Sequence, residues 1–151
     1  MNYSEKISKK LNTLLQKTYD AKKGYQLAAE KVESPAVKQF LNDKVLQRKH
    51  FAADLKAAIQ EFGWEAEKEG SLKGDIHRGW MELMASLTGN ETERILEEVE
   101  RGETASIKEY NAILEDDTYS LMPKTRTLLE NQRDAIQAAL NTSRMYETLV
   151  S

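Results

Sequence analysis

The sequence has 151 residues, of which 31% are charged and 40% are hydrophobic, and its formal net charge is −3. Both signs of charge are mixed finely along the chain, which argues against the basic surface that a nucleic-acid-binding protein needs. The absence of cysteine excludes disulfide scaffolds, thiolate metal sites and cysteine nucleophiles. No apolar run has the length of a membrane span or of a signal-peptide core, so a cytoplasmic protein with no membrane partner is expected.

The composition favours an all-α protein. Proline occurs only twice, and Ala, Leu, Glu, Lys and Gln, which favour helices, dominate. In the first half of the chain, apolar residues recur at alternating spacings of four and three, as in the seam of a left-handed helix bundle. Four long helices and one short helix are predicted, over residues 3–33, 35–62, 72–88, 91–115 and 122–149.

The predicted helices are separated by clear start and stop signals. Ser34 is suited to cap a helix that has Pro35 in its first turn. Gly63 follows a long periodic run, as a glycine at a helix C-terminus does. Asn90 and Glu93 have the spacing of a capping box, which places another helix start there.

The lengths of the connections predict the topology. The first two long helices, and likewise the last two, are joined by short connections, so each pair should form an antiparallel hairpin. The long connection between the hairpins contains the short helix, which at roughly 25 Å could carry the chain much of the way back along the bundle. Two hairpins joined by one long crossover make a ferritin-like four-helix bundle, and we expect a single domain of this kind over residues 1–151.

A ferritin-like bundle invites the hypothesis of a di-metal centre, which needs Glu residues from two helices and Glu-x-x-His motifs from the other two. The second long helix offers only Gln47 to His50, with an amide in place of the carboxylate, and the last offers Glu130 without a histidine. At 100° per residue, His50 and Glu130 both project away from their apolar stripes. We therefore predict no metal centre, and Glu103 and Glu100 remain as the candidate metal ligands.

Glu103 projects close to the centre of the apolar stripe of its helix, so its carboxylate should be buried. The same projection places Lys44, Arg48 and Gln132 on inward-facing seams and Lys22 near the margin of another. These bases would repel a metal ion, whereas a buried carboxylate needs such donors. The sequence therefore predicts a buried polar layer with Glu103 and Arg48 as its favoured ion pair, which the fork of the guanidinium could make bidentate.

The short helix contains His77 and Trp80. Histidine titrates near neutral pH and could act as an acid or base, but His77 has no carboxylate partner nearby in the sequence, so a packing role is favoured. Trp80 shares a face with apolar residues and is predicted to lie in the core, with Gly79 on the same face permitting close helix contact. Four other large side chains fall at helix ends, where exposure would mark an oligomer interface: Tyr3, Trp64, Tyr119 and Met122.

Four segments together resemble a bacterial ferritin-like four-helix-bundle family of unknown function: AKKGYQLAAEKV, LQRKHFAADL, GSLKGDIHRGWMELMASLTG and ILEEVERGETASIKEYNAIL. The HRGW-to-LTG segment and the following ERGE are the most specific parts of the resemblance. The resemblance implies a ferritin-related bundle without an established activity. It also implies that Lys22 stands where the family often has an acidic residue, which weakens a metal role further.

The leading hypothesis is a non-enzymatic cytoplasmic bundle without a cofactor that forms a homo-oligomer, with a stress-related role suggested by the resemblance alone. The alternative is a carboxylate-bridged iron or manganese protein that handles iron or oxidants. A third hypothesis is a binding module that presents the HRGW helix to a partner protein.

Overall fold

The computed structural model describes residues 2–70, 75–89 and 91–150. It contains five helices and, within these residues, no strand: α1 (Tyr3–Lys31), α2 (Pro35–Glu61), α3 (Asp75–Ser86), α4 (Thr92–Leu114) and α5 (Pro123–Val150). The prediction of an all-α protein is confirmed, and the long helices end within two residues of their predicted ends. None of the described helices is long and apolar enough to cross a membrane.

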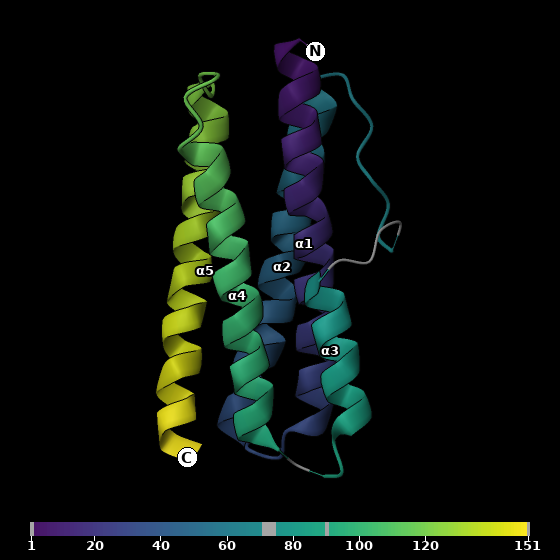
Figure 1. The fold of residues 1–151 in the computed structure, drawn as a ribbon, viewed down its shortest axis with the longest axis vertical. Coiled ribbons are helices and arrows are strands. Elements are labelled where there is room, and N and C mark those ends of the chain that lie inside the picture. Colours follow the sequence, from purple (N-terminus) through teal and green to yellow (C-terminus); the bar gives the residue numbers. More distant parts are fainter. Residues whose placement is uncertain (1, 71–74, 90, 151) are drawn as a thin grey trace.

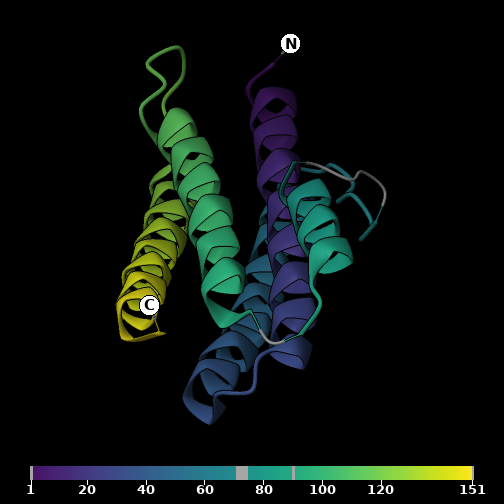
Figure 2. The same ribbon diagram turned by 60° about the horizontal axis from the view of Figure 1, so that its bottom comes forward.

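The four long helices form two antiparallel hairpins, α1 with α2 and α4 with α5 (Figure 1). α2 and α4 run in the same direction, so the chain must return along the length of the bundle between them (Figure 1). An extended segment covers the first part of the return and α3 covers the second. Figure 2 shows α3 lying against α1, on the side away from α5, and α3 also contacts α4. This crossover confirms the ferritin-like topology.

The local signals act as expected at the first hairpin. The Ser34 hydroxyl accepts a hydrogen bond from the backbone N–H of Val37 at 3.3 Å, and Pro35 begins α2. Gly63 has φ +82°, a left-handed conformation that glycine adopts without a steric penalty, and it ends the turn after α2. At α4, the predicted cap Asn90 lies outside the described residues; the N-cap position is held by Glu91, whose side chain makes no capping hydrogen bond.

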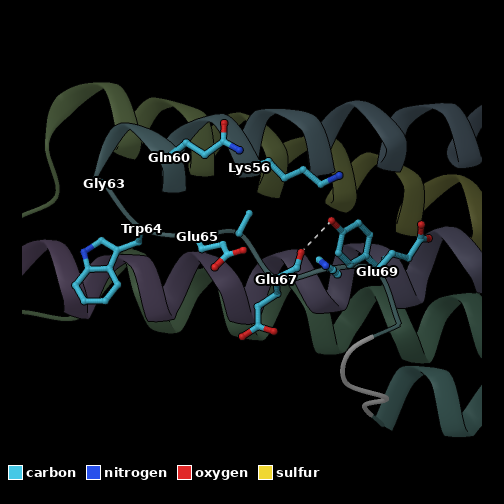
Figure 3. A pocket seen from close by; sticks show the side chains of 10 residues that line it. Lys56, Gln60, Gly63, Trp64, Glu65, Glu67 and Glu69 are labelled. Atoms are coloured by element: carbon cyan, nitrogen blue, oxygen red, sulfur yellow. Dashed lines mark hydrogen bonds between the residues drawn. The ribbon is translucent and has the colours of Figure 1, made fainter.

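Residues 64–70, which we call the strap, run without regular secondary structure beside α1 and α2 and end in a turn at Gly70. Asn12 of α1 binds the strap twice, donating to the Glu65 carbonyl at 3.3 Å and accepting from the Glu67 N–H at 2.8 Å. The Tyr19 hydroxyl donates to the Glu67 carbonyl at 3.3 Å (dashed in Figure 3). Side chains of α1 thus satisfy strap backbone groups that a neighbouring strand would otherwise pair.

The apolar core consists of two clusters on either side of the bundle's middle. Nearer the start of α1, the cluster includes Ile7, Leu11, Leu14, Leu55, Ile59, Ile113 and Leu129. Nearer the α1–α2 turn, it includes Ala28, Val32, Leu41, Trp80, Ile95 and Val99. Between them lies a layer of buried polar side chains, which is the candidate site.

Trp80 is 4% exposed, which confirms that it belongs to the core. Its indole lies directly over Gly24 of α1, where a β-carbon would overlap the ring. Gly79 has a similar function on the neighbouring side of α3, because a β-carbon there would collide with the ion pair between Arg101 and Glu98 of α4. Two glycines on different helices therefore allow α3 to pack closely against the bundle.

Candidate functional site

The centre of the candidate site is a buried ion pair between α2 and α4. Arg48 is 1% exposed and Glu103 is 2% exposed. Arg48 Nη1 donates to Glu103 Oε1 at 2.8 Å, and Nη2 donates to Oε2, so both carboxylate oxygens are engaged in a bidentate arrangement. Each of these charges offsets the cost of removing the other from water, so the loss of one partner would leave the other buried without a counter-charge.

Aromatic rings and an amide surround the guanidinium of Arg48. The rings of Tyr25 and Phe51 have their centroids 5.5 and 5.6 Å from its central carbon, which is within cation–π range. Its Nε donates to the Gln47 side-chain oxygen at 3.3 Å. Burial alone would lower the pKa of Arg48, but the Glu103 carboxylate outweighs burial and the pKa is raised. Arg48 is therefore a permanent cation in the middle of the bundle.

The layer continues through Tyr110 and Gln132. The Tyr110 hydroxyl donates to Gln132 Oε1 at 2.6 Å, and Gln132 Nε2 donates to the Phe51 carbonyl at 3.4 Å. Burial is the main cause that raises the pKa of Tyr110 above its ordinary value, and it raises the pKa of Tyr25 likewise. Both phenols are consequently protonated at neutral pH. Tyr110 acts as a hydrogen-bond donor to Gln132, whereas the buried Tyr25 hydroxyl makes no hydrogen bond within the described residues and its ring packs against Arg48.

The predicted layer is only partly the observed one. The structure brings Arg48, Glu103 and Gln132 together, but it places Lys22 and Lys44 elsewhere. Lys22 forms an ion pair with Glu69 of the strap at 2.7 Å, and the Lys44 ammonium lies 5.7 Å from the centre of the Phe40 ring. Both residues have long aliphatic stems that allow the charge to reach the surface from an inward-facing position on the helix, and this avoids the cost of desolvation.

The donors in this layer do not fit a di-metal centre. The layer has one carboxylate, which Arg48 already engages through both oxygens, and that fixed positive charge would repel a metal ion. The other candidate, Glu100, instead accepts a hydrogen bond from Arg144 of α5 at 3.0 Å. Within the residues that the structure describes, no three His, Asp or Glu side chains are grouped to hold a metal.

A family model described as a domain of unknown function (DUF2383) matches residues 6–116. The chain belongs to the DUF2383 family. A comparison with curated proteins gave no match.

Two solved structures resemble this DUF2383 protein. One is a conserved hypothetical protein, rv2844, from Mycobacterium tuberculosis, with 12% identity, a TM-score of 0.71 and coverage of 91% of this chain and 93% of that chain. The other is a dodecameric thioferritin, the bacterioferritin-related protein from Bacteroides fragilis, with 17% identity, a TM-score of 0.79 and coverage of 98% and 88%. At these identities the likeness shows the fold alone, which is the ferritin-like bundle.

The remaining candidate residues of the DUF2383 protein lie outside the layer. His77 is half-buried and Arg78 is exposed on α3, whereas the neighbouring Trp80 is turned into the core. His50 is exposed, as the helix projection predicts, and Glu130 is half-buried. A protein that bound the HRGW segment would therefore contact His77 and Arg78 but not the buried Trp80.

The large side chains at the helix ends gather where α1 begins. The Tyr3 hydroxyl accepts a hydrogen bond from the Met122 N–H at 3.1 Å, and Trp64 Nε1 donates to the Ser4 hydroxyl at 3.5 Å. The Tyr119 hydroxyl donates to a backbone carbonyl of α4. Trp64 and Met122 are 42% and 55% exposed, but this cluster has an internal role, because it ties α1 to the strap and to the start of α5.

Two members of the layer in the DUF2383 protein, Tyr25 and Tyr110, are not among the residues predicted from the sequence. Both fall on the apolar stripes of their helices, and both are buried. Their hydroxyls make them polar as well. A signal was present for Tyr110, because a buried tyrosine usually finds a hydrogen-bonding partner, as Tyr110 does in Gln132.

Neighbouring carboxyl groups lie on the surface between α4 and α5. Glu147 of α5 is half-buried beside Glu100 and Glu97 of α4. Burial, a hydrogen bond with Glu100 and repulsion from Glu100 and Glu97 raise the pKa of Glu147 to about 7. Hydrogen bonds from Glu147 and then Arg144 lower the pKa of Glu100. The two carboxyl groups thus share one proton.

This shared proton predicts a pH dependence of stability. The folded state holds the Glu147 proton more tightly than the unfolded chain does, so protonated Glu147 adds to the free energy of unfolding at low pH. This contribution is lost as pH rises from 4.5, the ordinary pKa of the group, towards the folded-state pKa of about 7. Glu147→Gln keeps a donor for Glu100 without the charge, so its urea midpoint should change less between pH 5 and pH 8 than that of the wild type. The exposed Glu93→Gln is the control, and equal pH dependence in all three proteins would contradict the shared proton.

Proposed function

We propose that this protein is a non-enzymatic, cytoplasmic, ferritin-like bundle that associates with copies of itself and handles neither iron nor oxidants. The observation that carries the proposal is the bidentate pair of Arg48 and Glu103, which gives the middle of the bundle a fixed ion pair. Neutral Tyr25 and Tyr110 and the amide of Gln132 complete the layer. None of these groups is an available nucleophile, base or metal ligand, so the layer has a structural role.

Self-association is supported by the fold and by the surface. The bacterioferritin-related protein from Bacteroides fragilis, which has a similar fold, is dodecameric. The surface exposes large apolar side chains, among them Leu46 in the middle of α2. The stress-related role comes from the family resemblance alone, and a rise in the abundance of the protein under oxidative stress is the measurement that would support it.

Metal analysis tests the structural role of the layer. Protein purified from iron-supplemented cells should contain iron and manganese far below one ion per chain, because Arg48 occupies both oxygens of Glu103. Elemental analysis of the wild type and of Glu103→Gln should give the same low value. Near-stoichiometric metal in the wild type that is lost in Glu103→Gln would overturn the proposal in favour of the carboxylate metal protein.

A further inference from the structure

Leu46 is an exposed leucine in the middle of a long helix. It exposes 59% of its surface, and it lies two residues before buried Arg48, which places it on the opposite side of α2. The polar layer and the core account for the inward side of α2 but not for this outward leucine. A large aliphatic side chain at such a position gains most when another surface covers it.

The surface beside Leu46 is hollowed. A groove runs between α1 and α2, and its lining includes Leu27 of α1 and Asn42 and Val45 of α2. Leu27 and Val45 are half-buried and give the groove an apolar part, whereas the rest of its lining is mainly polar and includes Lys23, Gln26, Glu30 and Lys38. Asn42 lies one turn before Leu46, which sets the protruding leucine directly next to the hollow. A ridge next to a groove can fit a second copy of the same surface.

The charges around Leu46 decide the orientation of such a copy. Asp43 lies one turn before Leu46, and Lys49 and His50 lie one turn after it; all three are exposed. Gln39 donates to Asp43 Oδ1 at 2.7 Å, which holds this carboxylate on the outer surface of α2. Parallel copies would set like charges against each other, whereas antiparallel copies set the acidic half of each beside the basic half of the other.

We propose that the outer face of α2, formed by Asn42, Asp43, Leu46, Lys49 and His50, is the surface on which a second copy of this chain docks in antiparallel orientation. The inference rests on the self-association in the proposed function and assigns the surface responsible. Each Leu46 meets the groove of the other copy, and the contact is isologous, so that every interaction occurs twice. A contact centred on one helix per copy is small, which predicts a weak, concentration-dependent pair.

Sedimentation velocity on the full chain, from micromolar to near-millimolar concentration, tests this surface. The mass of the wild type should rise with concentration, and Leu46→Glu should weaken association at least about tenfold. Met145→Glu on α5 is the matched control, because Met145 is 52% exposed, and it should behave as the wild type. Circular dichroism should show that both variants keep their helices.

Charge reversal tests the orientation separately. Asp43→Lys should weaken association at low salt, because both halves of the face become basic, and Asp43→Lys combined with Lys49→Asp should restore it. A wild type that is monomeric throughout would overturn self-association and this surface together. If the wild type associates and Leu46→Glu associates just as strongly, the proposed surface is wrong while self-association stands. Failure of the double reversal to restore association would overturn the antiparallel orientation.

Discussion

Replacing Glu103 with alanine should lower the free energy of unfolding by about 3–5 kcal/mol, because it leaves the buried guanidinium of Arg48 without its counter-charge. Arg48 is 1% exposed and both of its terminal nitrogens donate to Glu103, so the substitution removes both of these hydrogen bonds from a group that water cannot reach. Urea denaturation followed by circular dichroism measures the change.

Two further variants separate the ion pair from ordinary effects of the substitution. Glu97→Ala removes an exposed acid from the same helix and should change stability by less than about 1 kcal/mol. Replacing both partners, with Arg48→Met and Glu103→Leu, should recover most of the loss, because an apolar pair of similar volume has no charge to desolvate. A Glu103→Ala midpoint equal to that of Glu97→Ala would show that the pair does not stabilise the fold.

Replacing Trp80 with alanine should destabilise the protein by about 3–5 kcal/mol, because it empties the space between α3 and α1. The indole covers Gly24, and it contributes to the cluster that includes Val99 and Leu41. The loss should be accompanied by faster amide exchange in α3, since Trp80 is a large buried side chain that anchors this helix.

The contact between Trp80 and Gly24 can be tested by a double-mutant cycle. Gly24→Leu alone should be strongly destabilising, because even its β-carbon would overlap the indole. In the Trp80→Ala background, the same leucine should be tolerated or should stabilise, because it enters the vacated space. Gly89→Ala is the control, since a β-carbon there would meet nothing within 4 Å. Additive effects of Gly24→Leu and Trp80→Ala would contradict direct packing between the two residues.

Much of the fold follows from patterns that act over short distances. Ser34 and Pro35 start α2 and Gly63 ends its final turn because a cap, a ring and a left-handed glycine act on the backbone of neighbouring residues. The pairing of Arg48 with Glu103 was also predictable, because each lies on the inward stripe of a helix whose direction the connections determine. The predicted start of α3 at residue 72 lies outside the described residues, and α3 is observed from Asp75.

The sequence by itself determined the all-α class, the crossover topology and the central ion pair, since all three depend on helical periodicity and on connection length. Only the tertiary structure decided where the flexible charges of Lys22 and Lys44 lie, because a long side chain can reach solvent or a partner such as Glu69 from the same backbone position. It also decided that Trp80 covers Gly24, because two residues so far apart in the sequence meet only once the helices are packed. Tyr25 and Tyr110 belong to the polar layer for the same reason, since the groups that they contact, Arg48 for the Tyr25 ring and Gln132 for the Tyr110 hydroxyl, lie on other helices.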